Sequence, residues 1–228
     1  MSRPLLLVGT GGLGRETAEA ARAGSFWKPV AWADDDPAMW GTELDGLPVL
    51  GGTDSAVGSG ASVVLCPGRG ATRGLLADRL AAAGLTEDRY ATVVHPAASI
   101  AASCTLGAGS VVLAGTVLTA SVTVGRHAVL MPGVVLTHDD VLADLVTVCA
   151  RATLAGGVQV GTGAYLGAGC LVREHVAVGA WSVVGMGAVV LRDVPAHETW
   201  VGVPARQLRP KVAPDRSTPP QSEEHVPL

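Results

Sequence analysis

The chain has 228 residues and a formal net charge of −4 at pH 7, and 48% of its residues are hydrophobic but only 4% aromatic. This slightly acidic balance gives no reason to expect binding to nucleic acid or to an anionic membrane. No apolar stretch approaches the roughly 18 residues that a membrane-spanning helix needs. The short apolar run at the N-terminus stops at glycines and has no signal-peptide cleavage site.

The four cysteines, Cys66, Cys104, Cys149 and Cys170, contain no CxxC pair. Free cysteine packs as a small apolar side chain, and three of the four lie between residues 100 and 190. We therefore expect a cytoplasmic protein with reduced thiols rather than a disulfide-stabilised scaffold.

Residues 1–93 alternate short apolar runs with helical spacing. The apolar runs predict strands at 5–8, 30–33, 63–66 and 92–94, and the helical spacing predicts helices at 12–23 and 73–83. Strands that alternate with helices are typical of a parallel sheet with crossover connections. We predict an α/β domain here, with His95 and Pro96 at its junction with the next domain.

A glycine-rich loop follows the first predicted strand and opens the first helix. It reads Gly9-Thr10-Gly11-Gly12-Leu13-Gly14 and matches G-x-G-x-x-G, in which backbone N–H groups and a helix N-terminus favour phosphate. Asp34 and Asp35 end the second strand, where a ribose-binding acid is expected. A domain of about 90 residues holds one mononucleotide-binding half rather than two. A nucleotide-sugar diphosphate fits such a half-site, although the glycines could instead serve only helix–sheet packing.

From residue 100 to residue 190 an aliphatic residue recurs at every sixth position without a break. The positions are Ile100, Leu106, Val112, Leu118, Val124, Leu130, Leu136, Leu142, Val148, Leu154, Val160, Leu166, Val172, Val178, Val184 and Val190. The fourth residue after each is nearly always small. A short fixed period predicts a parallel β-helix, since an α-helix needs spacing near 3.6 and an amphipathic strand needs alternation. Spacing alone leaves open a purely structural solenoid.

This repeat resembles the hexapeptide acyltransferases. The resemblance implies a left-handed β-helix with three hexapeptides per coil, assembly as a homotrimer, and acyl-coenzyme A bound at the seams between subunits. We therefore expect an α/β Rossmann-like half-domain over residues 1–93 and a left-handed parallel β-helix over 94–195. Residues 196–228 would form a terminal loop and a tail rich in Pro, Ser and charge, which we expect to be disordered.

The two-domain layout resembles one subgroup, the sugar acetyltransferases related to PglD and NeuD, over nearly all of residues 4–208. The resemblance implies that the N-terminal domain binds a nucleotide-linked sugar. The matching substrate-binding positions are Gly9, Gly11, Gly12, Leu13, Gly14, Asp34, Asp35 and Gly68. Leu13 stands where the family usually has His, and Thr147 stands where some relatives place a His near the cofactor.

His138 is the candidate general base. It lies in Leu136-Thr137-His138-Asp139-Asp140-Val141, the one hexad with an acid, Asp140, at the usually small inward position. Acetyl transfer from a thioester requires removal of a proton from the attacking group, and imidazole titrates near neutral pH. The family's catalytic His is followed by an acid, which implies that Asp139 orients His138. Asp140 could assist, or it could turn toward solvent.

The resemblance also implies a cofactor groove along later coils. A main-chain N–H, matched here by Gly156, would stabilise the oxyanion. The predicted coenzyme A contacts are Gly156, Gly167, Ala168, Gly185, Met186, Gly187 and, in the closing loop, Arg206. Cys149 could carry the acyl group, but no His stands beside it in the sequence, so we favour direct transfer.

The sequence thus predicts an acetyl-CoA-dependent N-acetyltransferase that acts on a nucleotide-linked amino sugar and contains no metal. O-acetylation of a sugar such as sialic acid is the alternative within the same class, because both reactions need the same base. A metal-dependent β-helix enzyme resembling γ-carbonic anhydrase would need three histidines at a trimer seam. A NAD-binding regulatory protein built on a solenoid is the third alternative.

Overall fold

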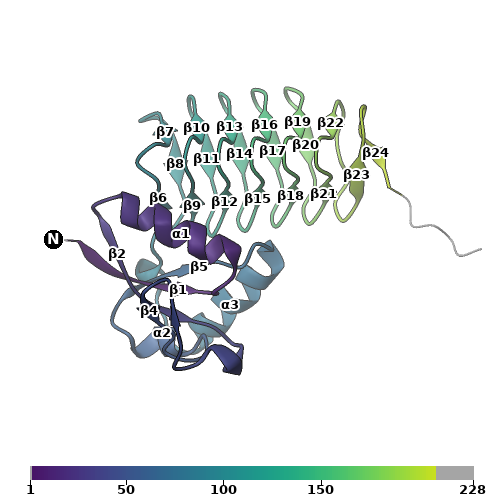
Figure 1. Cartoon of the computed structure of the whole chain (residues 1–228). Coiled ribbons are helices and arrows are strands. Elements are labelled where there is room, and N and C mark those ends of the chain that lie inside the picture. The colour runs from purple at the N-terminus through teal and green to yellow at the C-terminus, as the bar shows by residue number, and fades with distance from the viewer. Residues whose placement is uncertain (1, 209–228) are drawn as a thin grey trace, which may run out of the picture.

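The computed structural model of the protein describes residues 2–208. An α/β domain packs against the side of a left-handed parallel β-helix near the start of that helix (Figure 1). Over residues 2–208 no α-helix is both long and apolar enough to cross a membrane. The tail predicted to be disordered lies outside these residues from 209 onward.

The N-terminal domain is built on a three-stranded parallel sheet in the order β2-β1-β5. Its strands and helices are β1 (Arg3–Val8), α1 (Gly12–Ala23), β2 (Trp27–Ala33), β5 (Ser62–Leu65) and α3 (Gly70–Ala82). Leu5 and Leu7 pack with the buried face of α1, whereas Leu6 and Val8 pack with Leu80 of α3. The continuous apolar run of β1 is therefore explained by burial of both faces of the sheet.

Smaller elements of this domain were not anticipated from the sequence. They are the hairpin of β3 (Glu43–Leu44) and β4 (Leu47–Pro48), helix α2 (Ser55–Gly58), and the 3-10 turns η1 (Pro37–Met39) and η2 (Glu87–Arg89). Strands of two residues and single helical turns are too short to leave a periodic pattern.

The β-helix has three parallel sheets, which we call sheets I, II and III. Sheet I contains β7 (Ser99–Ile100), β10 (Val117–Leu118), β13 (Val135–Leu136), β16 (Thr153–Leu154), β19 (Leu171–Val172) and β22 (Val189–Val190). Sheet II contains β8 (Thr105–Leu106), β11 (Thr123–Val124), β14 (Val141–Leu142), β17 (Gln159–Val160) and β20 (Ala177–Val178). Sheet III contains β6 (Val93–Val94), β9 (Val111–Val112), β12 (Val129–Leu130), β15 (Thr147–Val148), β18 (Tyr165–Leu166), β21 (Val183–Val184), β23 (Thr199–Val201) and the antiparallel β24 (Arg206–Gln207).

Each strand pairs with the strand eighteen residues further along, as Leu118 does with Leu136 and Leu136 with Leu154. The aliphatic position of every hexad therefore stacks inside the coil, and these side chains form one continuous core. The small residue of the hexad completes that core, since Ala128, Ala152 and Ala164 are fully buried.

The strand predicted at 92–94 does not belong to the α/β sheet. It is β6, whose Val93 and Val94 pair with Val111 and Val112 as the first strand of sheet III. The chain leaves the α/β domain at Tyr90, which makes a single bridge to Val63. A short apolar strand at a domain junction carries no sign of which sheet it will join, so this assignment was wrong.

The two domains are joined by a buried arginine. Arg73 of α3 is fully buried and donates six hydrogen bonds: to the carbonyls of Pro67, Gly68, His127, Leu145 and Val146 and to the Thr147 hydroxyl. Three of those carbonyls belong to turns of two successive coils. Burial lowers the pKa of Arg73 to about 10, so the side chain stays cationic at neutral pH.

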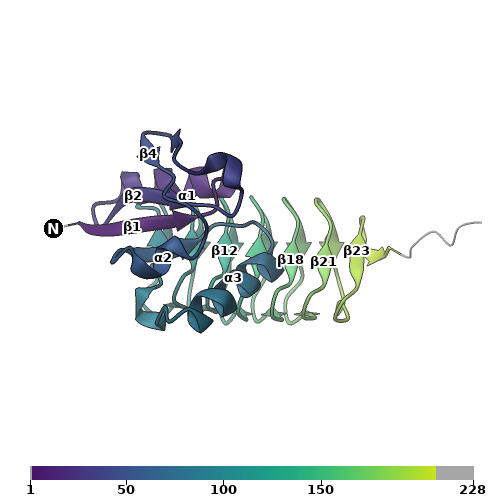
Figure 2. The ribbon, with the colours of Figure 1, turned by 90° about the horizontal axis from the view of Figure 1, so that it is seen from below.

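Apolar contacts between the two domains add to the hydrogen bonds of Arg73. The outward faces of Val93, Val111 and Val129 in sheet III are buried against the α/β domain. Figure 2 shows the domain covering the first coils, with β18, β21 and β23 beyond it. Only the first part of sheet III is thus covered by the domain.

We expect Arg73→Met to lower the free energy of unfolding by about 3 to 5 kcal/mol, because it leaves several buried carbonyls at the junction without donors. Denaturant unfolding measures this loss. Arg79→Met is the matched control on the same helix: the Arg79 side chain is 44% exposed and forms ion pairs with Asp35 and Asp54, so we expect a much smaller loss than in Arg73→Met. Equal losses in the two variants would contradict the central role of Arg73.

Candidate active site

The predicted base and the predicted oxyanion donor lie in neighbouring turns on one edge of the β-helix. We call this the I–II edge, because its turns connect sheet I to sheet II, at residues 101–104, 119–122, 137–140, 155–158 and 173–176. His138 lies in the third of these turns and Gly156 in the fourth. Residues eighteen apart stack on successive coils, so these two positions are direct neighbours.

The His138 imidazole lies over the α-carbon of Gly156, since a Cβ added to Gly156 would overlap the ring. His138 Nδ1 is 2.9 Å from a carboxylate oxygen of Asp139. An ionised carboxylate only accepts hydrogen bonds, so Nδ1 carries the proton and Nε2 keeps its lone pair. Asp139 adopts a left-handed φ of 63°, and its N–H donates to Ala120 on the preceding coil. The turn thereby holds the imidazole with Nε2 beside Gly156.

The backbone N–H of Gly156 is available to a ligand. The N–H groups on either side already have acceptors. Ala155 N–H donates to the Val172 carbonyl, and Gly157 N–H donates to the His138 carbonyl at 2.9 Å. Within residues 2–208 we find no backbone acceptor for the Gly156 N–H. A donor and an imidazole acceptor therefore lie side by side on this edge.

Asp140 points into the coil and not toward solvent. Its side chain is fully buried and accepts hydrogen bonds from the N–H groups of Thr137 and Val158, each at 2.9 Å. Burial raises the pKa of Asp140 to about 6, and the two N–H donors and His138 oppose that rise. The alternative that Asp140 is a solvent-facing corner residue is therefore wrong.

The structure adds one histidine that sequence reasoning passed over. His175 lies on the same edge, and its ring covers the α-carbon of Gly157 as that of His138 covers Gly156. Its N–H donates to the Gly156 carbonyl at 3.0 Å. The eighteen-residue spacing from Gly157 to His175 could have revealed this contact.

The predicted coenzyme A residues lie on a different edge. Gly167, Ala168 and the Gly185–Gly187 segment form turns between sheets III and I, which we call the III–I edge. Met186 projects outward there with 82% of its surface exposed, and Arg206 lies in β24 at the end of sheet III. The whole width of sheet I separates this edge from His138. One chain therefore does not bring the predicted base and most of the predicted cofactor residues together.

The predicted nucleotide-binding residues gather where the three parallel strands of the α/β domain end. The glycine loop follows β1, Asp34 and Asp35 follow β2, and Gly68 lies between β5 and α3. Ligands of parallel α/β sheets bind at this end of the strands. The residues predicted from the loop and the strand ends therefore share one side of the domain.

Some of the predicted nucleotide-binding residues stabilise the α/β domain itself. Asp34 accepts hydrogen bonds from the Thr10 N–H and hydroxyl at 2.8 and 2.6 Å, which shapes the glycine loop. Gly14 is packed against Trp32, and Leu13 is buried in the core. In contrast, a Cβ at Gly11 or at Gly12 would meet open space. Gly11 and Gly12 are therefore the loop positions open to a ligand.

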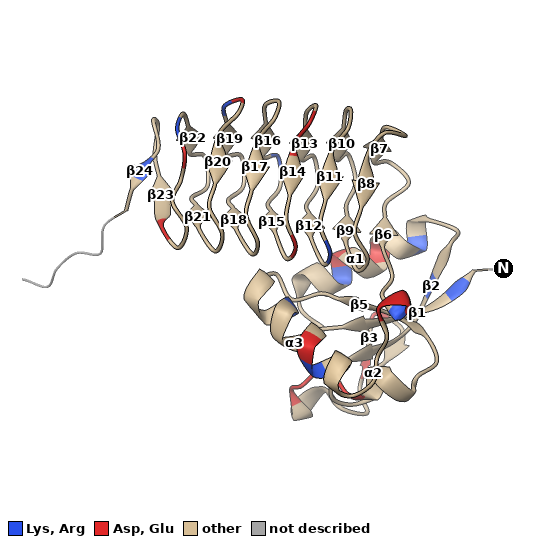
Figure 3. Ribbon diagram, turned by 180° about the vertical axis from the view of Figure 1, so that it is seen from behind, with Lys and Arg blue, Asp and Glu red and all other residues tan. Residues whose placement is uncertain are grey.

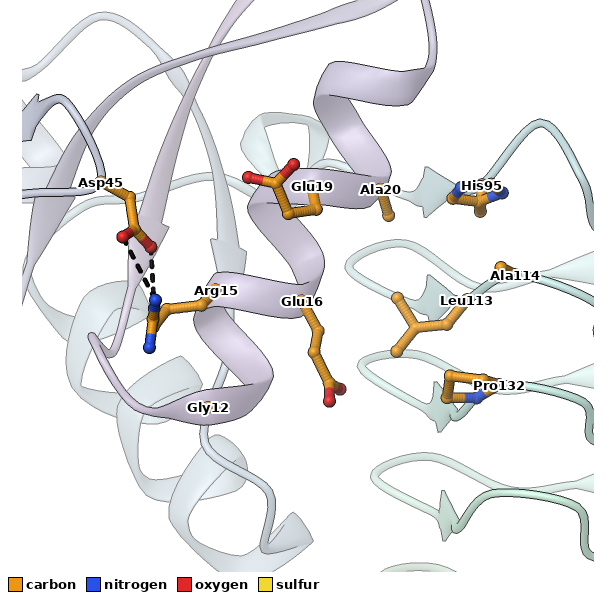
Figure 4. A pocket seen from close by; sticks show the side chains of 10 residues that line it. All are labelled: Gly12, Arg15, Glu16, Glu19, Ala20, Asp45, His95, Leu113, Ala114 and Pro132. Carbon is orange, nitrogen blue, oxygen red and sulfur yellow. Dashed lines mark hydrogen bonds and ion pairs between the residues drawn. The ribbon is translucent and has the colours of Figure 1, made fainter.

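Two cavities flank this side of the domain. The first, of about 700 Å³, separates α1 from the III–I edge. Figure 4 shows Glu16 between α1 and the turns of Leu113 and Pro132, while Arg15 is paired with Asp45. The remaining residues that line it are Gly12, Glu19, Ala20, His95 and Ala114. The second, of about 530 Å³, is lined by residues 68–71 and by Gly163, Tyr165, Trp181 and Val183.

Thr147 lies in β15 of sheet III and not in a turn of the III–I edge. It is buried under the α/β domain, where its hydroxyl donates to the Gly68 carbonyl at 2.9 Å and accepts from Arg73 at 3.0 Å. This position connects the end of β5 to sheet III.

Metal binding and an acyl-cysteine are the two other chemistries to compare with the described residues. Residues 2–208 of one chain hold no group of three or more His, Cys, Asp or Glu side chains that could bind a metal ion. Cys149 is buried, and burial raises the pKa of its thiol. A thiol whose pKa is raised is a poor nucleophile at neutral pH.

Solved structures share the two-domain fold of this chain. The GDP-perosamine N-acetyltransferase of Caulobacter crescentus, in complex with CoA and GDP-perosamine, superimposes with a TM-score of 0.83 at 30% identity, over 91% of this chain and 97% of that one. The acetyltransferase domain of PglB from Neisseria gonorrhoeae superimposes with a TM-score of 0.81 at 29% identity, over 91% and 100% of the two chains. The second of these has also been solved with acetyl coenzyme A.

Matches among curated proteins are shorter. A UDP-3-O-acylglucosamine N-acyltransferase from a Caulobacter species is 36% identical over 72 residues, which are 32% of this chain and 21% of that protein. The chain spans less than half the length of the curated relatives it matches. No protein-family model matches the sequence.

We expect Gly156→Ala to displace the His138 ring, because the new methyl group would occupy its place. A crystal structure of the variant should show the imidazole rotated away and its bond to Asp139 lost. The melting temperature should change no more than in Gly58→Ala, where the added methyl group meets open space. An unmoved ring in the variant would contradict the contact described for Gly156.

Proposed function

This chain belongs to the hexapeptide-repeat sugar acetyltransferases, and we propose that it transfers the acetyl group of acetyl-CoA to the amino group of a nucleotide-linked sugar. One observation carries the proposal. The His138 imidazole, with its Nδ1 on Asp139, lies over the α-carbon of Gly156, and within residues 2–208 the Gly156 N–H has no backbone acceptor. Acyl transfer needs this pair, a proton acceptor beside an oxyanion donor.

The amino nitrogen of the sugar attacks the thioester carbonyl, and His138 Nε2 removes the proton that the nitrogen gives up. The carbonyl oxygen then becomes an oxyanion and accepts a hydrogen bond from the Gly156 N–H. When the tetrahedral intermediate collapses, the carbon–sulfur bond breaks and the proton passes from His138 to the departing thiolate. The products are an N-acetyl sugar and free coenzyme A. Asp139 stabilises the imidazolium formed on the way.

Direct transfer fits this chain better than a covalent acyl-enzyme. The thiol nearest in sequence, Cys149, is buried, and its pKa is raised. The imidazole of His138 is 65% exposed and leaves its accepting nitrogen free for an amine. Direct transfer in a single step therefore does not require the buried Cys149 thiol to become exposed.

The exposure of His138 and Asp139, 65% and 67% of the two side chains, indicates that another surface completes the site. Sheet I lies between the His138 edge and the coenzyme A edge. Its outward face consists of Ser99, Val117, Val135, Thr153, Leu171 and Val189, and in Figure 3 no strand of sheet I carries charge. An uncharged, mostly apolar face of this kind favours association. We propose a homotrimer in which the base edge of one subunit faces the cofactor edge of the next.

The acceptor sugar belongs in the cavity between α1 and the III–I edge. That cavity begins at Gly12, in the glycine loop proposed for the nucleotide, and continues along the edge proposed for coenzyme A. Glu16 and Glu19 line it and can accept hydrogen bonds from sugar hydroxyl or amino groups. A hydroxyl acceptor would use the same base, so O-acetylation is the second candidate reaction.

The reaction is tested by following free thiol release from acetyl-CoA with UDP-, dTDP- and GDP-linked amino sugars. We expect turnover on one of them and a fall in kcat of about 10² to 10⁴ in His138→Ala, since general base catalysis contributes that much. Coenzyme A binding, measured by calorimetry, should remain. His197→Ala is the control, because His197 is also an exposed histidine, in the turn before β23 and away from the I–II edge, and it should keep wild-type turnover.

Other outcomes would change the proposal in defined ways. Thiol release with hydroxyl acceptors and none with amines would establish the O-acetyl reaction instead. Full activity in His138→Ala together with inactivity in His175→Ala would move the base to His175. Absence of thiol release with every acceptor would refute acetyl transfer altogether.

The trimer is tested by placing charge on sheet I. We expect Val135→Arg combined with Leu171→Arg to reduce the mass in light scattering from three times 23.0 kDa to 23.0 kDa and to abolish thiol release. Repulsion and desolvation of the arginines would oppose association. The control is Phe26→Arg with Leu75→Arg, two side chains that are 58% and 71% exposed on the α/β domain. An active wild-type protein of 23.0 kDa would contradict the trimer.

A further inference from the structure

Asp140 is an unusual residue for the interior of this β-helix. The equivalent inward positions of other hexads hold uncharged side chains, either small ones such as Ala128 and Ala152 or valines such as Val146. Among residues 2–208, Asp140 is the only Asp or Glu that is buried. Burying a carboxylate is costly unless its oxygens are hydrogen-bonded, whereas alanine would fill the core at no such cost. The presence of Asp140 therefore indicates that its carboxylate has a specific role.

The hydrogen bonds of Asp140 indicate what this role is. One oxygen accepts the N–H of Thr137, the residue immediately before His138. The other accepts the N–H of Val158 on the next coil, which closes the turn of Gly156 and Gly157. The carboxylate thus bridges the two turns that carry the proposed base and the proposed oxyanion donor. The Gly157 N–H bond to the His138 carbonyl links the same two turns on the outside.

We propose that Asp140 is a positioning residue for the acyl transfer: its carboxylate keeps the turn of His138 in register with the turn of Gly156. This role rests on the proposed function. The spacing between the base and the oxyanion donor is then set by a buried link that solvent does not reach. A displacement of about 1 Å at reacting groups can cost on the order of 100-fold in rate, so a link of this kind affects kcat and not only stability.

A matched control exists in the same β-helix. Asp144 also accepts a backbone N–H across two coils, from Arg126 at 2.7 Å, and the sequence separation is again eighteen residues. It lies in a turn between sheets II and III, away from the edge of His138. Loss of Asp144 therefore removes an equivalent coil-to-coil bond without touching the proposed site.

The experiment compares Asp140→Ala, Asp140→Asn and Asp144→Ala with the wild-type protein. Thiol release is measured well below the melting temperature of each variant, and hydrogen exchange is followed over residues 135–141 and 153–160. In Asp140→Ala we expect kcat to fall about 10- to 100-fold with an unchanged KM for acetyl-CoA. The Thr137 and Val158 amides should exchange faster. The kcat of Asp140→Asn should lie between those of Asp140→Ala and the wild-type protein, because the amide retains one accepting oxygen. Asp144→Ala should keep wild-type kcat.

The outcomes separate this role from the proposed function. If Asp140→Ala exchanges faster at both turns but keeps wild-type kcat, Asp140 is only structural and the inference is overturned. An equal fall of kcat in Asp140→Ala and Asp144→Ala would also overturn it, since any lost coil-to-coil bond would then suffice. If Asp140→Ala does not fold, Asp140→Asn decides by the same criteria. A wild-type protein inactive toward every acceptor refutes the proposed function, and this role with it.

Discussion

The arrangement of this protein depends on the buried guanidinium of Arg73. Its partners are carbonyl oxygens and one hydroxyl, drawn from the α/β domain and from turns of the β-helix. A guanidinium has five N–H donors in a fixed plane, so it can satisfy carbonyls that approach from several directions. The domain is thereby held at one position along the β-helix. The glycine loop, the strand ends and the cavity beside α1 take their places relative to the later coils from this contact.

The proposed site follows from the geometry of a three-sided coil. Residues eighteen apart stack directly, which places His138 over Gly156 and His175 over Gly157. Residues six or twelve apart fall on other edges, which separates Gly167, Gly185 and Gly187, proposed for coenzyme A, from the base by the width of sheet I. A β-helix therefore builds lines of residues along an edge easily, but it cannot close a pocket by itself. The α/β domain closes one side, and the exposed His138 and uncharged sheet I leave the other side to a second subunit.

Parts of the site could be predicted because they are encoded locally. The His138–Asp139 contact joins adjacent residues, and the position of Gly156 follows from the repeat. The hexad register placed Asp140 at an inward position, but the sequence left open whether a carboxylate there is buried, because burial depends on the hydrogen bonds from the N–H groups of Thr137 and Val158. The buried place of Thr147 and the cavity lined by Glu16 and Pro132 depend on how the two domains meet, and no periodic pattern records that contact.

The sequence by itself determined the β-helix and the α/β domain before it, because the six-residue aliphatic repeat and the glycine loop each follow a local rule within one segment. The class of the enzyme came from the resemblance of these segments to the hexapeptide acyltransferases. Only the tertiary structure decided that residues 93 and 94 join sheet III, that Arg73 joins the domains, and that Asp140 links two turns across coils. Those features are contacts between segments far apart along the chain. Their energies depend on burial and on the direction of hydrogen bonds, and both exist only once the coils have stacked and the domain has docked.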